Sequence, residues 1–153
     1  MHPYPHTYTA SAFGRRNGAV SVSSPLLPSL ETSPPPQFGG PEGVWSPETL
    51  LVASLADCFI LTFRGVARAA RLEWLDLECR VEGILERVDG ESQFTRYVTY
   101  AKLTVPSNTD TARARELLER AEHGCLIANS VRGVRTLNAQ VSLASATGEK
   151  APA

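Results

Sequence analysis

A nearly uncharged apolar segment at residues 49–63 constrains this chain more than any other feature. Its only formal charge is Asp57, and it is preceded by Ser46-Pro47-Glu48. Those three residues favour a helix start, because Ser caps, Pro suits the first helical position and Glu complements the helix dipole. A helix that is apolar nearly all round is a buried helix. Its apolar run is too short to span a bilayer, so we expect it in a protein core or an oligomer interface.

Length and charge limit the classes of function. The chain has 153 residues, which suits one domain; we place that domain at residues 1–145 and a small, polar, disordered tail at 146–153. Fifteen basic against sixteen acidic residues give a net charge of −1, which argues against a nucleic-acid coat or a polybasic membrane binder. The first ten residues have no basic or apolar signal region, so we expect a cytoplasmic protein with reduced thiols.

The remaining patterns predict short strands and one further helix. Period-two alternation and turn residues place strands at residues 6–13, 19–23, 27–32, 75–82, 94–105 and 136–143. Residues 111–122 have one apolar face, which predicts an amphipathic helix. The Pro-rich residues 33–41 form neither a helix nor a central strand and are interpreted as a long loop. Because hairpins predominate over βαβ units, we expect an α+β fold with a largely antiparallel sheet.

The three cysteines are the first candidates for chemistry. Cys79 alternates in register with apolar residues on a strand, so a buried small hydrophobe is the favoured interpretation. Cys58 lies in the middle of the apolar helix, where a core role is again the commoner one. Cys125 follows Gly124 at the end of the amphipathic helix. There is no CxxC pair, and the histidines have no ligand spacing with the cysteines, so we expect neither a metal site nor a cofactor.

Taken together, three segments resemble the OsmC/Ohr family of hydroperoxide-reducing proteins. Residues 46–59, from Ser-Pro-Glu to Cys58, are similar to its (N/S)PE-x-L…C motif, including the ten-residue spacing from Glu to Cys. Residues 125–130, Cys-Leu-Ile-Ala-Asn-Ser, are similar to its second Cys motif, although the Ohr branch usually has Cys-Pro there. Residues 14–21 are similar to its N-terminal arginine hairpin, and either Arg15 or Arg16 is the functional arginine.

This resemblance implies a fold and an activity. The family fold is a largely antiparallel sheet wrapped around a long central helix in an intertwined homodimer, with sites at the subunit interface. The implied activity is a thiol peroxidase for organic hydroperoxides. Cys58 would attack the peroxide and become a sulfenic acid, and Cys125 would resolve it as an intramolecular disulfide. A lipoylated protein or another dithiol would then reduce the disulfide.

The chemistry of these residues agrees with that role. Only a thiolate attacks peroxide, and a mid-helix Cys58 is not activated by a helix N-terminus, so it needs a fixed cation. Arg15, or Arg16, would supply the charge, and Glu48 would hold the guanidinium by a bidentate pair. On one continuous helix Glu48 and Cys58 would be about 15 Å apart. Glu48 therefore lies on a loop that folds back, or it comes from a second subunit.

Two other interpretations stay open. The same fold could be a non-catalytic module that binds a small apolar ligand, and the two thiols could be inert core residues. In the enzymatic interpretation, the pocket for the alkyl chain of the substrate would be lined by Phe38, Trp45, Leu51 and Phe59. Trp45 and Phe59 are equally typical of a plain core, and Glu48 and the arginines have ordinary surface roles without the cysteine motifs.

Overall fold

The computed structural model describes residues 2–145, and the chain divides into two compact units, one ending at Leu51 and one beginning at Val52. The tail predicted at residues 146–153 lies outside the described residues, and the single domain over residues 1–145 stays a prediction. The elements in chain order are β1 (Ser11–Phe13), β2 (Val20–Ser23), β3 (Leu30–Thr32), η1 (Pro36–Phe38), α1 (Pro47–Ala70), β4 (Asp76–Val88), β5 (Glu91–Val105), α2 (Thr111–Gly124), η2 (Ala128–Ser130) and β6 (Val134–Leu143).

The first unit contains a small antiparallel sheet in the order β1-β2-β3. The predicted hairpin and the third strand are therefore confirmed, with shorter strands than the sequence suggested. β1 ends at Phe13 and β2 begins at Val20, so residues 14–19 form a loop longer than a two-residue Asn-Gly turn. Gly18 has a φ of 97° in that loop, which glycine adopts without a steric cost. The Pro-rich segment is a loop apart from the single turn of η1.

The hydrogen bonds at the start of the central helix confirm the predicted cap at Ser46. The Ser46 hydroxyl accepts a hydrogen bond from the Thr49 backbone N–H at 3.2 Å, and the Thr49 hydroxyl accepts one from the Ser46 N–H at 2.9 Å. This reciprocal cap satisfies two backbone donors that a helix start leaves without partners. From Pro47 the helix continues without a break to Ala70.

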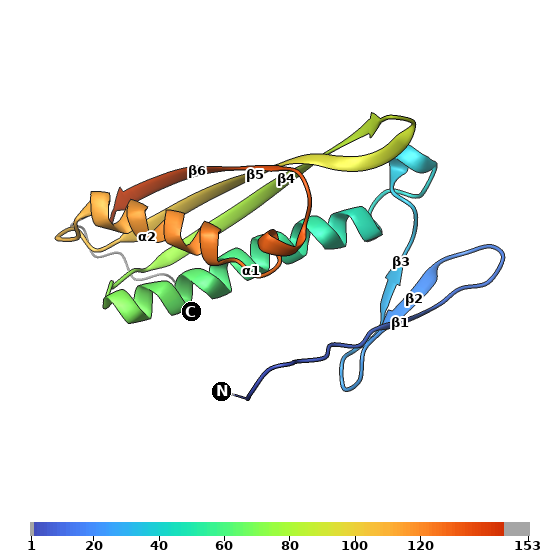
Figure 1. The fold of residues 1–153 in the computed structure, drawn as a ribbon, viewed down its shortest axis with the longest axis horizontal. Coiled ribbons are helices and arrows are strands. Elements are labelled where there is room, and N and C mark those ends of the chain that lie inside the picture. Colours follow the sequence, from blue (N-terminus) through green and yellow to red (C-terminus); the bar gives the residue numbers. More distant parts are fainter. Residues whose placement is uncertain (1, 146–153) are drawn as a thin grey trace. The chain divides into compact units, whose positions relative to one another are not determined.

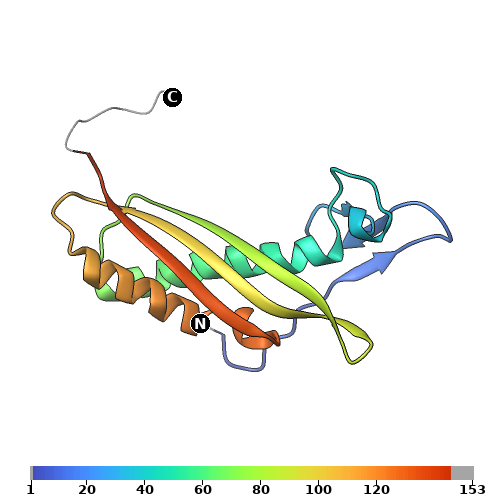
Figure 2. The ribbon, with the colours of Figure 1, turned by 90° about the horizontal axis from the view of Figure 1, so that it is seen from above.

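In the second unit, α1 and α2 cover one face of a three-stranded sheet with the order β4-β5-β6 (Figures 1 and 2). β4 and β5 form the predicted long hairpin, with the turn at Asp89 and Gly90. β6 pairs with β5 in parallel, because α2 carries the chain back along the sheet as a βαβ crossover. The α+β fold with a largely antiparallel sheet is confirmed, and this single parallel pair is a feature that the alternation pattern alone did not reveal.

Two glycines set the spacing of these layers. A Cβ atom at Gly83 of β4 would lie 2.8 Å from side-chain atoms of Val52 on α1 and Phe94 on β5. Gly133, which directly precedes β6, has a φ of 110°, and a Cβ there would lie 2.7 Å from the Thr95 carbonyl oxygen. The first glycine lets the helix approach the sheet, and the second lets β6 begin against β5.

One stripe of α1 forms the core with the sheet and α2. Its buried residues recur every four positions: Leu55, Phe59, Phe63 and Ala67. They pack with buried residues of the other elements, namely Ala101, Leu103 and Val105 of β5 and Ala114, Leu117, Leu118 and Ala121 of α2. A spacing of four keeps side chains on one helix face, so a single stripe meets the sheet.

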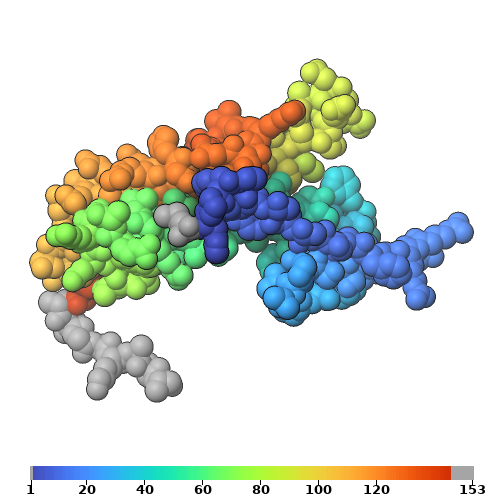
Figure 3. All heavy atoms as spheres, turned by 60° about the horizontal axis from the view of Figure 1, so that its bottom comes forward, coloured from blue at the N-terminus to red at the C-terminus, as the bar shows by residue number. Residues whose placement is uncertain are grey.

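The other faces of α1 are not covered to the same extent. Leu61 is 52% exposed, and atoms from the second half of the helix reach the surface (Figure 3, green). By length and composition alone α1 could cross a bilayer, since an 18-residue stretch has a mean hydropathy of 1.8. A core helix passes the same test, and the stripe from Leu55 to Ala67 packs as one. The expectation of a helix buried all round is therefore met on one side only within a single chain.

The core predicts a clear contrast between two leucines. Leu103 on β5 is 1% exposed and Leu75, just before β4, is 57% exposed. Leu103→Ala should lower the free energy of unfolding by about 2–5 kcal/mol, because it leaves a cavity in the core. The matched Leu75→Ala should change it by no more than about 0.5 kcal/mol. Urea unfolding measures both, and equal losses would contradict this description of the core.

Candidate thiol site

The second unit brings two of the predicted site residues together. Cys58 lies on α1, and Cys125 is the C-cap residue directly after α2, with its backbone N–H bonded to the Glu122 carbonyl. Both belong to a cluster that also contains Leu55, Tyr97 and Ala128. The two thiols lie close enough for each side chain to shift the pKa of the other. All three cysteines of the chain are free thiols in this structure.

The loop after Cys125 surrounds the Cys58 sulfur with donors. Burial alone would raise the pKa of Cys58, but hydrogen bonds from the Ile127 backbone, the Cys125 and Thr62 side chains and the Leu126 backbone together lower it below its ordinary value. The Thr62 hydroxyl lies 3.9 Å from the sulfur. Donors aimed at a sulfur favour its anion. The sequence argument assigned this role to an arginine and missed the backbone N–H groups, for which no side-chain pattern gives a signal.

The other two thiols have raised pKa values, so they stay protonated at neutral pH. Burial raises the pKa of Cys125 to about 11, and its hydrogen bond to Cys58 acts in the same direction. Burial raises the pKa of Cys79 to about 12, with a smaller effect from the nearby Cys125. Cys79 packs against the main core, as the sequence predicted for a small buried hydrophobe. Cys58 is thus the thiol that ionises most readily.

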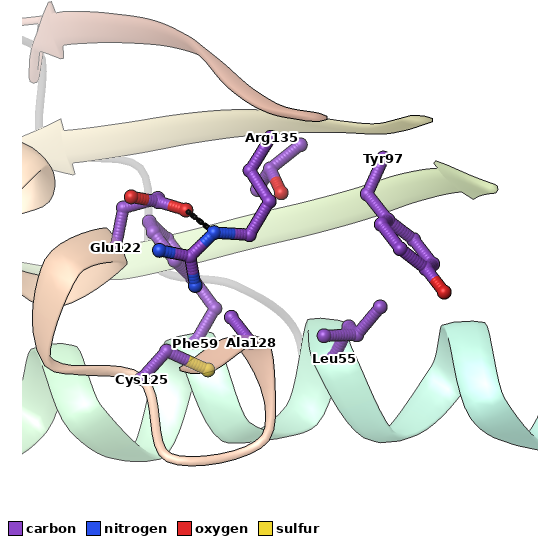
Figure 4. A pocket seen from close by; sticks show the side chains of 8 residues that line it. Leu55, Phe59, Tyr97, Glu122, Cys125, Ala128 and Arg135 are labelled. Atoms are coloured by element: carbon purple, nitrogen blue, oxygen red, sulfur yellow. Dashed lines mark ion pairs between the residues drawn. The ribbon is translucent and has the colours of Figure 1, made fainter. Parts of the chain in front are cut away.

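A small cavity lies beside Cys125 (Figure 4). Its volume is about 10 Å³, room for about one water molecule. It is lined by Leu55, Phe59, Tyr97, Thr99, Glu122, Cys125, Ala128 and Arg135. Of the residues expected to line an alkyl pocket, Phe59 is at this cavity. Phe38 and Trp45 are 58% and 47% exposed on the first unit.

An ion pair that the sequence argument did not single out borders the same cavity. Arg135 of β6 places Nε 3.4 Å from Oε1 of Glu122 on α2, and the two side chains are only 26% and 14% exposed. Arg135 Nη1 also donates to Asn129 Oδ1 at 3.1 Å. Side chains alternate between the two faces of β6, and this alternation predicts that Arg135 faces inward. That pattern is the sequence signal that could have pointed to Arg135.

The remaining predicted residues have separate locations. Glu48 is in the first turn of α1, ten residues before Cys58 on the same unbroken helix, so a fold-back loop is excluded. Its Oε2 atom is buried and has no hydrogen-bond partner among residues 2–145. Arg15 and Arg16 lie in the exposed loop between β1 and β2 of the first unit. No cluster of three or more potential metal ligands occurs in the described part of the chain.

The family assignment follows from a match to a family model. The model described as OsmC-like protein matches residues 40–138, a range that includes both thiols and Glu48. This chain belongs to the OsmC-like family. The resemblance noted in the sequence is thereby confirmed, and so is the family fold, with one long helix and a second helix on a mixed sheet.

Individual relatives agree with this assignment. An uncharacterized protein, YmaD of Bacillus subtilis, is 27% identical over 134 residues, which cover 85% of this chain and 88% of that protein. A crystal structure of an organic hydroperoxide resistance protein OsmC from Legionella pneumophila is 28% identical, with a TM-score of 0.71, covering 92% and 99% of the two chains. An OsmC-like protein of unknown function from Vibrio cholerae has a TM-score of 0.78 at 20% identity, covering 90% and 100%.

The pKa order of the thiols predicts selective alkylation. At pH 7.5 iodoacetamide should modify Cys58 first, because its lowered pKa gives it the largest thiolate fraction. Cys125 and Cys79 should react at least tenfold more slowly, since their pKa values of about 11 and about 12 keep them protonated. Peptide mass mapping at timed quenches measures this order, and preferential labelling of Cys125 would contradict it.

Proposed function

We propose that this protein is a cytoplasmic thiol peroxidase that reduces organic hydroperoxides through Cys58 and Cys125. The Cys58 thiolate attacks one peroxide oxygen, the O–O bond breaks, and the other oxygen leaves as an alcohol after it takes a proton. The sulfenic acid on Cys58 then reacts with the Cys125 thiol, which forms the disulfide and releases water. A dithiol, such as the lipoyl group of a lipoylated protein, reduces the disulfide and is itself oxidised.

The observation that carries this proposal is the pair of neighbouring thiols, in one cluster, with opposite pKa shifts. The attacking thiol needs a thiolate at neutral pH, and Cys58 has the lowered pKa. The resolving thiol must stay unreactive until the sulfenic acid forms, and Cys125 has the raised pKa. Structural relatives with organic hydroperoxide resistance in their names support the choice of substrate class.

The proposal also assigns roles to Arg15 and Glu48. An arginine of the β1–β2 loop, Arg15 or Arg16, stabilises charge at the peroxide and at the Cys58 thiolate. Glu48 orients that guanidinium, and its buried, unpaired Oε2 atom is a place for a cation to bind. Because Glu48 and Cys58 are about 15 Å apart along one helix, Glu48 serves the Cys58 of a second subunit.

A homodimer follows from the same reasoning. Only 22% of the apolar stretch of α1 is buried inside one chain, so the helix leaves an apolar face for a second copy. An interface that covers such a helix typically buries more than about 2,000 Å². The dimer therefore both covers the central helix and supplies the missing carboxylate.

Peroxide consumption tests the activity. Wild-type protein with a dithiol such as dihydrolipoamide should reduce cumene hydroperoxide, and Cys58→Ser should lose at least 99% of the rate because the nucleophile is gone. Cys79→Ser is the matched control and should keep the wild-type rate. After peroxide without reductant, mass mapping should find Cys58 linked to Cys125. A wild type as inactive as Cys58→Ser would favour an apolar-ligand module or inert thiols instead.

Subunit mixing tests the origin of Glu48. Glu48→Ala and Cys58→Ser should each be inactive alone. If Glu48 acts across the dimer, exchange between the two variants should restore up to about a quarter of the wild-type activity, because half of the dimers are mixed and each holds one intact site. No recovery after proven subunit exchange would contradict the assignment of Glu48 to the site of a second subunit, and a monomer by light scattering would contradict the dimer itself.

A further inference from the structure

Arg135 connects three segments that meet at Cys125. It lies on β6, its Nε pairs with Glu122 at the end of α2, and its Nη1 donates to Asn129 in η2. The loop that holds Cys125 runs between these two partners. Figure 4 shows the Arg135 guanidinium between Glu122 and the loop, directed toward Cys125 and Ala128.

Asn129 links Arg135 to the backbone around Cys125. Its Nδ2 donates to the His123 carbonyl at 3.0 Å, and its own N–H donates to the Cys125 carbonyl at 3.0 Å. The Ser130 hydroxyl bonds the Leu126 carbonyl at 2.9 Å. Cys125 and the N–H groups that point at Cys58 are therefore fixed to β6 through one guanidinium.

We propose that Arg135 is a positioning residue that holds the Cys125 loop against Cys58. The planar fork of an arginine bonds a carboxylate and an amide at once, a geometry that a lysine ammonium does not reproduce. The ion pair is mostly shielded from solvent, so it is stronger than an exposed pair. Its role in catalysis rests on the proposed function, but the pairing of the two thiols can be measured without peroxide.

Equilibration with glutathione tests the positioning. The reaction of the two protein thiols with oxidised glutathione gives the Cys58–Cys125 disulfide and two reduced glutathiones, and its equilibrium constant reports how well the thiols are aligned. In Arg135→Gln we expect that constant to fall on the order of tenfold, because a charged hydrogen-bond network is lost. Glu122→Gln keeps the shape of its side chain and should show a smaller fall, of about threefold.

A second measurement separates positioning from general stability. When the loop shifts, the Leu126 and Ile127 N–H groups no longer face Cys58, so the pH midpoint of Cys58 alkylation should rise in Arg135→Gln. Arg115→Gln is the matched control: Arg115 also donates to a β6 carbonyl, that of Ala139, and it should leave both the equilibrium constant and the midpoint unchanged. Arg135→Lys should recover only part of the loss, because one ammonium cannot form both bonds.

The outcomes are distinct from those of the peroxidase assay. Wild-type values of the equilibrium constant and midpoint in both Arg135→Gln and Glu122→Gln would overturn the proposal, and so would a wild type that forms no Cys58–Cys125 disulfide with oxidised glutathione. If Arg135→Gln does not fold, Glu122→Gln decides alone. A wild type that pairs its thiols with glutathione but consumes no hydroperoxide would reject the proposed function and leave the role of Arg135 in place.

Discussion

The packing of one apolar stripe of α1 against the sheet determines where everything else lies. Phe59 and Phe63 are almost fully buried between β5 and α2, so the rotation of the helix about its axis is fixed. Cys58 is the neighbour of Phe59, and this rotation places its sulfur at the edge of the core, where the end of α2 passes. A different face of α1 on the sheet would remove the thiol from its donors. The activity proposed here thus depends first on hydrophobic packing.

Much of the fold could be predicted because local signals were strong. Ser46 and Pro47 marked the start of α1, and Asp89-Gly90 marked the turn between β4 and β5. The parallel placement of β6 was not predictable in the same way, since an alternating strand has the same pattern in either direction. The strand bounds also differed, with β4 extending to Val88 where the sequence suggested an end near Glu82. Pairing with β5 maintains that extension, which is a property of two strands together.

The cysteines of the candidate site could be predicted from the sequence, but the groups that set their pKa values could not. Cys58 and Cys125 were found through motifs, and the structure brings them together in one cluster. The donors of Leu126 and Ile127 are backbone groups, which every residue has, so composition gives no indication of them. Arg135 directly precedes the strand expected at residues 136–143, and no motif pointed to it. Only its bonds to Glu122 and Asn129 distinguish it from the other arginines.

The parallel crossover from β5 through α2 to β6 has a consequence for how the site forms. Cys58 and Cys125 are 67 positions apart in the sequence, and the loop after Cys125 bonds to Arg135 of β6, whose strand pairs in parallel with β5. A hairpin such as β4–β5 forms from neighbouring residues, whereas a parallel pair must wait for its connecting helix. Contacts of long sequence separation form slowly because chain entropy opposes them. We therefore expect the thiol pair to form late in folding, so that the ionisable sulfur acquires its donors only in a nearly complete molecule.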